Sequence, residues 1–167
     1  PILSLAAGAS SRMRGGDKLL EQVQGQPLLR LQALRALATG EPVFVAQGPG
    51  DSERAKVIAD LDVTILTAPD AAEGMSATMR NAVAQLPNAD AFMMVLGDLV
   101  AIETRHLNAM IQARGAHPGH LIWRGATLDR KPGHPIIFDQ SLTQEFAKLQ
   151  GDGGGEALVK PRKDQTY

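Results

Sequence analysis

The sequence predicts an α/β protein with an open, mostly parallel β-sheet. Short apolar segments alternate with amphipathic helical patterns along the chain, as they do in repeated strand–helix–strand units. Several of the apolar segments have no polar face, which is typical of strands that helices cover on both sides. Segments rich in glycine and charge lie next to the ends of these strands, and open α/β sheets bind their ligands at such ends.

The predicted strands are short apolar runs that alternate with the helical patterns. No internal repeat or long linker divides them, so we expect one domain over residues 1–167. Helices between the strands favour right-handed crossovers and parallel pairing. The predicted strands are residues 2–7, 42–47, 63–67, 91–96, 121–123 and 135–138.

Apolar residues between the strands recur at helical spacing, which predicts amphipathic helices packed on the sheet. Thr104 is the expected N-cap of one of them. The methionine and phenylalanine stripes are interpreted as core rather than as cofactor contacts. The stripes comprise Met75, Met79, Ala82, Val83 and Leu86; Leu107, Met110 and Ile111; Ala55, Ile58 and Leu61; and Leu142, Phe146 and Leu149.

Composition narrows the function classes. The 167 residues carry a formal charge of −1 and are 44% hydrophobic, which suffices for a core and gives no electrostatic footprint for nucleic acid. The absence of cysteine excludes disulfides, thiolate zinc sites and cysteine nucleophiles, and it fits a cytoplasmic protein. The opening run "ILSLAA" is too short for a secretion signal or a membrane span, so no membrane partner is expected. The basic "KPRKD" near the end is interpreted as a frayed tail.

The segment "LAAGASSRMRGGDKLL", residues 5–20, is the most informative of the chain. It is not a P-loop, because Asp17 precedes Lys18 and Leu19 follows it, and it lacks the three spaced glycines of a dinucleotide-binding turn. What remains is a turn of small residues, which lets backbone N–H groups approach a ligand, followed by cations that suit several phosphates. We call residues 5–20 the opening segment.

The opening segment resembles the signature of nucleotidyltransferases with a glycosyltransferase-A-like fold, in particular the MobA-like NTP transferases. Within them it is most similar to the molybdenum cofactor cytidylyltransferase group. The resemblance continues in the family's order through "GQPLLR", "GMSATMRNAV", "VLGD", "GHPIIF" and "GDGGGEAL", and so it covers nearly the whole chain. It implies a three-layer α/β/α sandwich and transfer of a nucleotidyl group, CMP from CTP in that group, to a small phosphorylated acceptor such as molybdopterin, with Mg²⁺ as cofactor.

The resemblance also assigns roles to individual residues. Lys18, Arg12 and Asp98 would be catalytic, the two cations by holding the triphosphate and Asp98 by binding Mg²⁺, with Asp152 as a second metal ligand. His134 and Pro135 would line the acceptor side. The nucleotide-binding set would comprise Leu5, Ala6, Ala7, Gly8, Arg12, Lys18, Gly74 and Thr78.

Three positions depart from the family pattern. Leu99 and Val100 follow Asp98 where relatives usually have Met-Pro or Gln-Pro, and Glu156 stands where an arginine is common. These departures keep open a non-catalytic nucleotide-binding protein beside the enzyme. Within the same chemistry, a sugar- or polyol-phosphate acceptor is the alternative to molybdopterin, because the residues that shape the acceptor side come from scattered loops. Ala7 stands where guanylyltransferases have glycine, which favours CTP over GTP.

Structural alternatives also remain for the individual residues. Asp98 could cap the next helix, Asp152 could be a turn residue, and His134 could simply begin a strand. A zinc site at His117 and His120 is not expected, because no further ligands are near them in the sequence. The remaining charged candidates are interpreted as exposed, namely Arg14, Asp17 and the turn 129–131.

Overall fold

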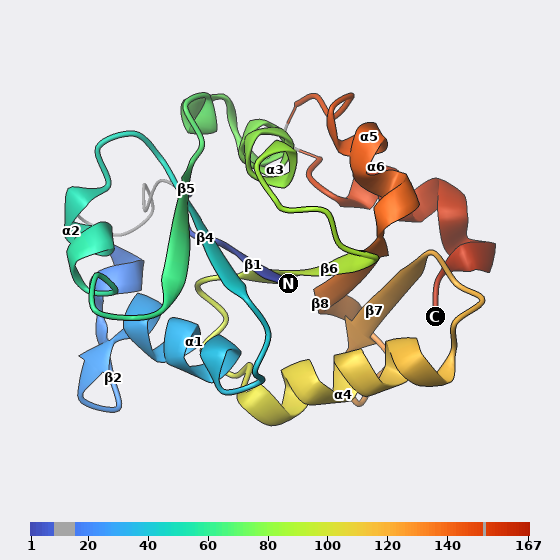
Figure 1. Ribbon diagram of the computed structural model, residues 1–167, viewed down its shortest axis with the longest axis horizontal. Coiled ribbons are helices and arrows are strands. Elements are labelled where there is room, and N and C mark those ends of the chain that lie inside the picture. The colour runs from blue at the N-terminus through green and yellow to red at the C-terminus, as the bar shows by residue number, and fades with distance from the viewer. Residues whose placement is uncertain (9–15, 152) are drawn as a thin grey trace.

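The predicted α/β architecture is confirmed by a computed structural model, which describes residues 1–8, 16–151 and 153–167. Within these residues, six strands form one sheet in the order β5-β4-β1-β6-β8-β7 (Figure 1). The four strands β5, β4, β1 and β6 are parallel to one another. The strands are β1 Ile2–Leu5, β4 Val43–Gln47, β5 Val63–Thr67, β6 Ala91–Leu96, β7 Ile122–Ala126 and β8 Pro132–Asp139.

The last two strands of the sheet run in a direction that the strand predictions do not specify. β8 pairs antiparallel with β6, with Phe138 opposite Phe92, and β7 pairs antiparallel with β8. The first residues of β8 and the last residues of β7 therefore lie at the same edge as the carboxyl ends of the parallel strands. This edge brings together segments that follow β1 and β6 and segments from the β7–β8 hairpin.

Helices cover both faces of the sheet, as in a three-layer sandwich (Figure 1). One face carries α1 and α4, and the opposite face carries α3 with the short helices of the C-terminal region. Alternate strand residues serve the two layers: Leu3 and Met94 pack under α3, whereas Ile2 and Met93 pack over α1 and α4. The helices are α1 Leu28–Leu37, α2 Ser52–Lys56, α3 Met75–Ala84, α4 Thr104–Ala116, α5 Thr143–Phe146 and α6 Glu156–Val159.

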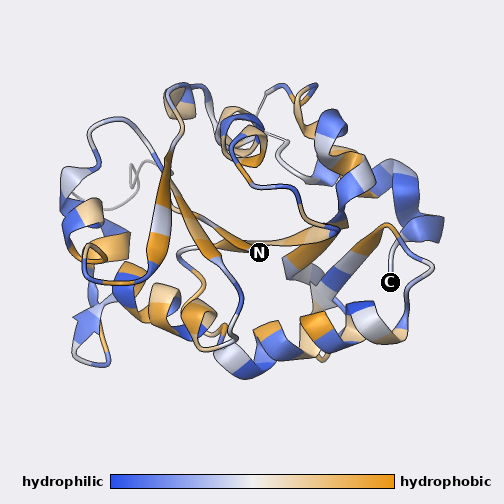
Figure 2. Cartoon of the chain, in the orientation of Figure 1, coloured by the Kyte–Doolittle hydropathy of each residue, from blue (hydrophilic) through white to orange (hydrophobic). Residues whose placement is uncertain are grey.

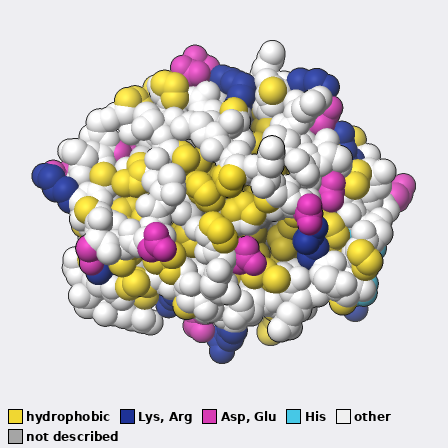
Figure 3. All heavy atoms as spheres, viewed as in Figure 1, with side chains coloured by type: hydrophobic (Ala, Val, Ile, Leu, Met, Phe, Trp, Pro, Cys, Tyr) yellow, Lys and Arg dark blue, Asp and Glu magenta, His cyan; other side chains and the backbone are white. Residues whose placement is uncertain are grey.

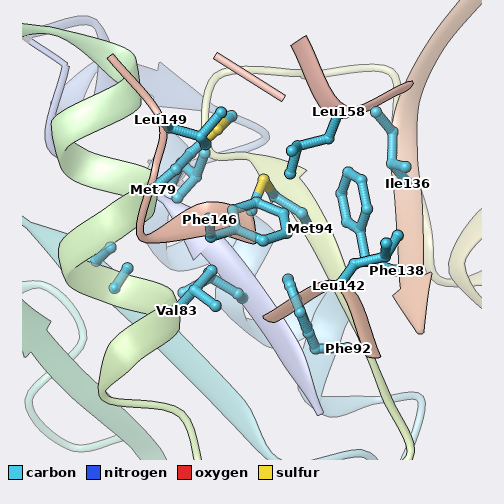
Figure 4. Packing of buried hydrophobic residues seen from close by; sticks show 14 of the residues in the cluster. Met79, Val83, Phe92, Met94, Ile136, Phe138, Leu142, Phe146, Leu149 and Leu158 are labelled. Atoms are coloured by element: carbon cyan, nitrogen blue, oxygen red, sulfur yellow. The ribbon is translucent and has the colours of Figure 1, made fainter. Parts of the chain in front are cut away.

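The predicted apolar stripes lie in the core. Met79 and Val83 of α3 face Phe92 and Met94 of β6, and Phe146 packs between them (Figure 4). The Phe92 and Phe146 rings meet edge to face with centroids 5.4 Å apart, a favoured aromatic geometry. The hydropathy colouring shows the same division, with apolar residues on the sheet and polar residues on the outer faces of the helices (Figure 2).

Several element boundaries differ from the sequence predictions. α2 ends at Lys56, so Ile58, though buried, lies in the turns after the helix rather than within it. α5 likewise ends at Phe146, before Leu149. The N-cap of α4 is Glu103 rather than Thr104, because Glu103 and His106 form a reciprocal capping box. These differences arise because side-chain burial does not require a helical backbone.

Two further parts of the chain adopt structure that was not predicted. A short antiparallel pair, β2 Gln22–Val23 and β3 Gln26–Pro27, leads into α1. The basic tail is not frayed: Lys160–Gln165 forms a 3-10 helix, and Tyr167 accepts from and donates to the backbone of β7. The tail thereby lengthens the sheet beyond β7, through a parallel bridge between Thr166 and Ile122.

The surface seen in Figure 3 has hydrophobic side chains near its centre and charged side chains mainly around its rim. Among the helices of residues 1–8, 16–151 and 153–167, none is long and apolar enough to cross a membrane.

Candidate active site

The order of the sheet marks one point as the expected ligand site. After β1 the chain builds β4 and β5 on one side, and it then places β6 on the other side of β1. A reversal of this kind opens a crevice at the carboxyl ends of the two strands that flank it, here β1 and β6. The residues that follow them are Ala6–Gly8 and Gly97–Asp98, both of which the sequence analysis had selected.

Lys18 and Asp98 meet at this point although 80 positions separate them. The Lys18 Nζ atom lies 2.9 Å from Asp98 Oδ2, and the two side chains are 49% and 43% exposed. An ion pair at such exposure contributes about 0–1 kcal/mol, so a competing ligand can separate it at low cost. The structure therefore presents an accessible cation and an accessible carboxylate side by side at the switch point.

Gly97 lets the two strand ends approach each other. A β-carbon at this position would lie 3.1 Å from the Leu5 carbonyl oxygen and 3.5 Å from the Ser4 hydroxyl oxygen. The Gly97 N–H donates to the Leu5 carbonyl at 3.0 Å, which fixes the backbone just before Asp98. A side chain at this position would therefore crowd the backbone at the end of β1, just before Asp98.

The segment after Asp98 is anchored beneath the sheet. The Leu99 carbonyl accepts from Gln32 Nε2 at 2.6 Å, and the Val100 carbonyl accepts from Arg35 Nη1 at 2.7 Å. The next helix is capped by Glu103, so Asp98 does not cap it. Leu99 and Val100, two of the residues that depart from the pattern of the resemblance, thus belong to an anchored connection between β6 and α4.

Arg54 is a residue of this edge that the sequence analysis missed. It is 5% exposed, and its guanidinium contacts the backbone at Ala6 and Gly8 and the carboxylates of Asp17 and Asp51. Asp17, which was predicted to be an exposed partner, instead forms a bidentate pair with it, with Nε donating to Oδ2 at 2.6 Å. In "DSERAK" an arginine has the pattern of a surface helix residue, so no sequence signal identified it.

The expected base and ribose contacts lie at the start of α3. Gly74 has a φ of 114°, a conformation that L-residues rarely adopt, and it immediately precedes the helix. Thr78 is 3% exposed and its hydroxyl donates to the Gly74 carbonyl at 3.4 Å. Gly74 is therefore the more accessible of the two, whereas the Thr78 side chain supports the backbone of the Gly74 turn.

The glycine-rich turn docks on the same end of α3. The buried Ser76 hydroxyl donates to the Gln150 carbonyl at 3.3 Å and accepts from the Gly154 N–H at 3.2 Å. A β-carbon at Gly154 would lie 3.2 Å from the Met75 side chain. The turn is thus attached close to the carboxyl edge, since α3 follows β5. Asp152 itself, like Arg12 and Arg14, lies outside the residues that the structure describes.

The predicted acceptor residues lie at the start of β8. A cis peptide bond joins His134 and Pro135, and His134 Nδ1 is 3.3 Å from the Met94 carbonyl oxygen. Burial lowers the pKa of His134 below its ordinary value; the charge of Arg124 lowers it further, while the Met94 carbonyl and Asp98 act in the opposite direction. His134 is therefore harder to protonate than an ordinary histidine, and the charges of Asp98 and Arg124 act on its pKa in opposite directions.

Arg124 and Glu156 form an ion pair next to His134. The Arg124 Nη2 atom lies 2.8 Å from Glu156 Oε2, and Arg124 Nε donates to the Gly133 carbonyl at 3.4 Å. The carboxylate that stands at the family's arginine position is thus balanced by an arginine from β7. The Glu156 side chain is 56% exposed, whereas the Arg124 side chain is 16% exposed.

Two other features of the described chain lack the paired cation and carboxylate of this crevice. A cavity of about 240 Å³ lies at the amino end of β6, lined by Ala91, Phe92, Gln140 and other residues without charge, so it offers no cation for phosphates. His117 and His120 pack against Tyr167, with the His117 and Tyr167 rings stacked 3.9 Å apart. Across residues 1–8, 16–151 and 153–167, no three His, Cys, Asp or Glu side chains form a group that could hold a metal ion.

Comparisons with solved structures identify proteins of the same fold. Rv0371c from Mycobacterium tuberculosis H37Rv is 25% identical with a TM-score of 0.81, and the match covers 95% of this chain and 80% of Rv0371c. A manganese complex of Rv0371c is 23% identical with a TM-score of 0.80, and the match covers 99% of this chain and 84% of that one. A nucleotidyl transferase from Methanothermobacter thermautotroptrophicus is 22% identical with a TM-score of 0.81, and the match covers 99% of this chain and 84% of the transferase. CMP:2-keto-3-deoxy-manno-octonic acid synthetase, complexed with CTP, is 15% identical with a TM-score of 0.74, and the match covers 99% of this chain and 88% of the synthetase.

A search of curated proteins finds no match. The family model of the MobA-like NTP transferase domain, by contrast, matches residues 2–166, almost the entire chain. This match agrees with the resemblance of the opening segment, with the sheet order, and with the nucleotidyl transferases among the similar structures. The chain belongs to the MobA-like NTP transferase family.

Proposed function

We propose that this chain catalyses Mg²⁺-dependent transfer of a nucleotidyl group, CMP from CTP, to a small phosphorylated acceptor, with release of pyrophosphate. The observation that carries the proposal is the Lys18–Asp98 pair at the crevice between β1 and β6. An accessible cation suits the phosphates of a nucleotide, and the adjacent carboxylate suits a hard divalent cation. Membership of the family supports the reaction class.

The reaction places modest demands on the protein. An acceptor oxygen attacks the α-phosphorus in line, a new P–O bond forms, and the bond to the departing pyrophosphate breaks. When the acceptor is an ionised phosphate, no proton has to be removed, and catalysis consists of positioning and charge neutralisation. Lys18 would contact the α-phosphate and Arg12 the remaining phosphates. No covalent enzyme intermediate is required.

The described residues fit a magnesium site that is completed by the substrate. Asp98 supplies one accessible carboxylate, and Mg²⁺ in nucleotide enzymes takes one or two carboxylates with phosphate and water oxygens. When bound, Mg²⁺ neutralises charge on the phosphates and orients them. Asp152 is the proposed second ligand, since its neighbours Gly151 and Gly153 flank it in the turn that docks on α3.

The acceptor would bind between His134 and the end of β6. The Met94 carbonyl can only accept, so its contact with His134 favours a proton on Nδ1 and leaves the Nε2 lone pair available to a donor on the acceptor. The phosphorylated acceptor of this proposal is molybdopterin or, as the alternative within the same chemistry, a sugar or polyol phosphate. In this proposal, residues of the β7–β8 hairpin contact the acceptor, whereas the segments after β1 and β6 hold the nucleotide.

Pyrophosphate release tests the proposal. Each of the four nucleoside triphosphates is incubated with molybdopterin and with a panel of sugar and polyol phosphates, with Mg²⁺ and with EDTA. We expect metal-dependent pyrophosphate with CTP and one acceptor class. Binding of nucleotide without pyrophosphate in any combination would instead support the non-catalytic nucleotide-binding protein, and the acceptor that responds separates molybdopterin from the sugar phosphates.

Calorimetric titration with the four nucleotides tests the preference for CTP. Ala7 is 9% exposed beside Gly8 at the end of β1, and its methyl group narrows the space next to the backbone there. We expect CTP to bind more tightly than GTP, and we expect Ala7→Gly to reduce that difference, because the substitution removes the methyl group. Tighter binding of GTP by the unmodified protein would contradict the assignment of the base.

A further inference from the structure

We propose that Arg54 is the positioning residue of the nucleotide site, acting through Asp17 on Lys18. The inference rests on the proposed function and extends it to a residue outside the family motifs that the sequence analysis recognised. Arg54 lies in α2, after β4, and apart from Asp51 the groups it contacts belong to the opening segment. It is the buried connection between the two described ends of that segment.

Every N–H donor of the Arg54 guanidinium has an acceptor in the protein. A guanidinium has five N–H donors. Nε donates to Asp17 Oδ2, Nη1 donates to the Ala6 carbonyl at 2.6 Å and to Asp51, and Nη2 donates to the Gly8 carbonyl at 3.0 Å and to Asp17 Oδ1 at 3.1 Å. All five donors are used, so Arg54 has none left for a phosphate and is not itself a ligand of the nucleotide.

The contacts of Arg54 join the backbone after β1 to Asp17, which precedes Lys18. Ala6 and Gly8 precede residues 9–15, and Asp17 follows them, so one planar group fixes the points at which the chain leaves β1 and returns. A lysine at this position has one compact ammonium group and cannot reproduce the planar fork that spans these partners. Arg54 thereby determines where the backbone resumes immediately before Lys18.

Asp17 in turn fixes the short helix that carries Lys18. Asp17 Oδ1 accepts both from Arg54 and, at 3.0 Å, from the Leu19 N–H, and so it caps the 3-10 helix Lys18–Leu20. Leu19 is 5% exposed and anchors that helix in the core beside the sheet. With the carboxylate and Leu19 both fixed, the Lys18 side chain projects from a rigid turn toward Asp98. A nucleotide then finds the cation in place rather than having to select a rare conformation.

The test uses Arg54→Lys with a matched control. Arg30 also forms a bidentate pair with an aspartate and donates to a backbone carbonyl, but it lies on α1, and its partners are Asp60 and Val57. Arg30→Lys therefore changes the same chemistry away from the site. Charged hydrogen bonds of this kind correspond to roughly tenfold effects or more on an equilibrium. We expect the dissociation constant for CTP with Mg²⁺, measured by calorimetry, to rise about tenfold in Arg54→Lys and to be unchanged in Arg30→Lys.

A double-mutant cycle distinguishes positioning from general destabilisation. If Arg54 acts through Lys18, Arg54→Lys should weaken CTP binding much less in a Lys18→Ala background than in the unmodified protein. Equal effects in both backgrounds, or normal binding by Arg54→Lys, would overturn the inference. Failure of the unmodified protein to bind any nucleotide would overturn the proposed function instead.

Asp17→Asn provides a second variant in case Arg54→Lys does not fold. The change is isosteric, and one amide oxygen can still cap Leu19, but an NH₂ group then faces an Arg54 donor. We expect weaker CTP binding in the same direction and the same non-additivity with Lys18→Ala. Binding equal to that of the unmodified protein would contradict the proposed route through Asp17.

Discussion

Arg54 pairs with Asp17 and Lys18 pairs with Asp98, but of the two cations only Arg54 is buried. Its side chain is 6% exposed and shares its donors among two carboxylates and two carbonyls, whereas Lys18 is 49% exposed and Asp98, its partner, 43%. Removing one partner of a buried pair leaves a charge without compensation, while an exposed pair can be exchanged for solvent or ligand. One pair therefore maintains the local fold, and the other is available for chemistry.

Replacing Asp98 tests the exposed pair most directly. We expect Asp98→Asn to abolish Mg²⁺-dependent pyrophosphate release, a loss of more than about 10²-fold, because the amide cannot supply an anionic ligand. The folded state should be retained, since the carboxylate is largely exposed. Initial rates across a magnesium titration, with circular dichroism as the control for folding, provide the measurement. Full activity at ordinary magnesium concentrations would remove Asp98 from the proposed mechanism.

Replacing Lys18 should separate activity from stability. We expect Lys18→Ala to lower turnover by about 10²–10³-fold, because a point charge at the reacting phosphate is lost. The free energy of unfolding should change by less than about 1 kcal/mol, because both members of the pair are accessible to solvent. Pyrophosphate release and denaturant titration measure the two quantities. A large loss of stability would show that this pair, like that of Arg54, has a structural role.

The smallest expected effect concerns His134 and the pH dependence of stability. Its pKa in the folded protein is lowered, chiefly by burial, so the unfolded chain binds the proton more readily. Stability should therefore fall as the pH drops below about 6.5, the ordinary value for histidine. Thermal unfolding between about pH 5.5 and 7.5 measures this slope, above the range in which carboxylates titrate. His134→Gln should flatten it, and an unchanged slope would assign the effect to other groups.

The sequence predicted the parallel part of the fold well because its signal is local. Apolar runs and helical periodicity located β5 and β6 with the observed boundaries. The rule for strand ends selected Asp98, and the cations of the opening segment selected Lys18. The direction of β8 was not predictable in this way. An apolar run such as residues 135–138 reads the same whether its neighbour is parallel or antiparallel.

The position of Arg54 was beyond such reasoning for a different reason. Its partners are separated from it by up to 48 positions along the chain, and none of them marks an arginine as buried. Arg124 was missed similarly, because its pairing with Glu156 depends on how α6 packs beside the β7–β8 hairpin. Ion pairs that join separate elements depend on tertiary structure, so neither periodicity nor spacing reveals them.

The antiparallel direction of β8 has a consequence for how proteins of this architecture can diversify. In the proposed site, the nucleotide is held by connections that follow parallel strands and lead into crossovers. The acceptor side belongs to a hairpin closed by the turn Thr127–Lys131, with Leu128 fully exposed at its tip. The sheet places β6 between this hairpin and β1, so insertions at the tip of the hairpin need not alter the strand ends that hold the nucleotide. The acceptor side of the proposed site can therefore vary while the nucleotide side is retained.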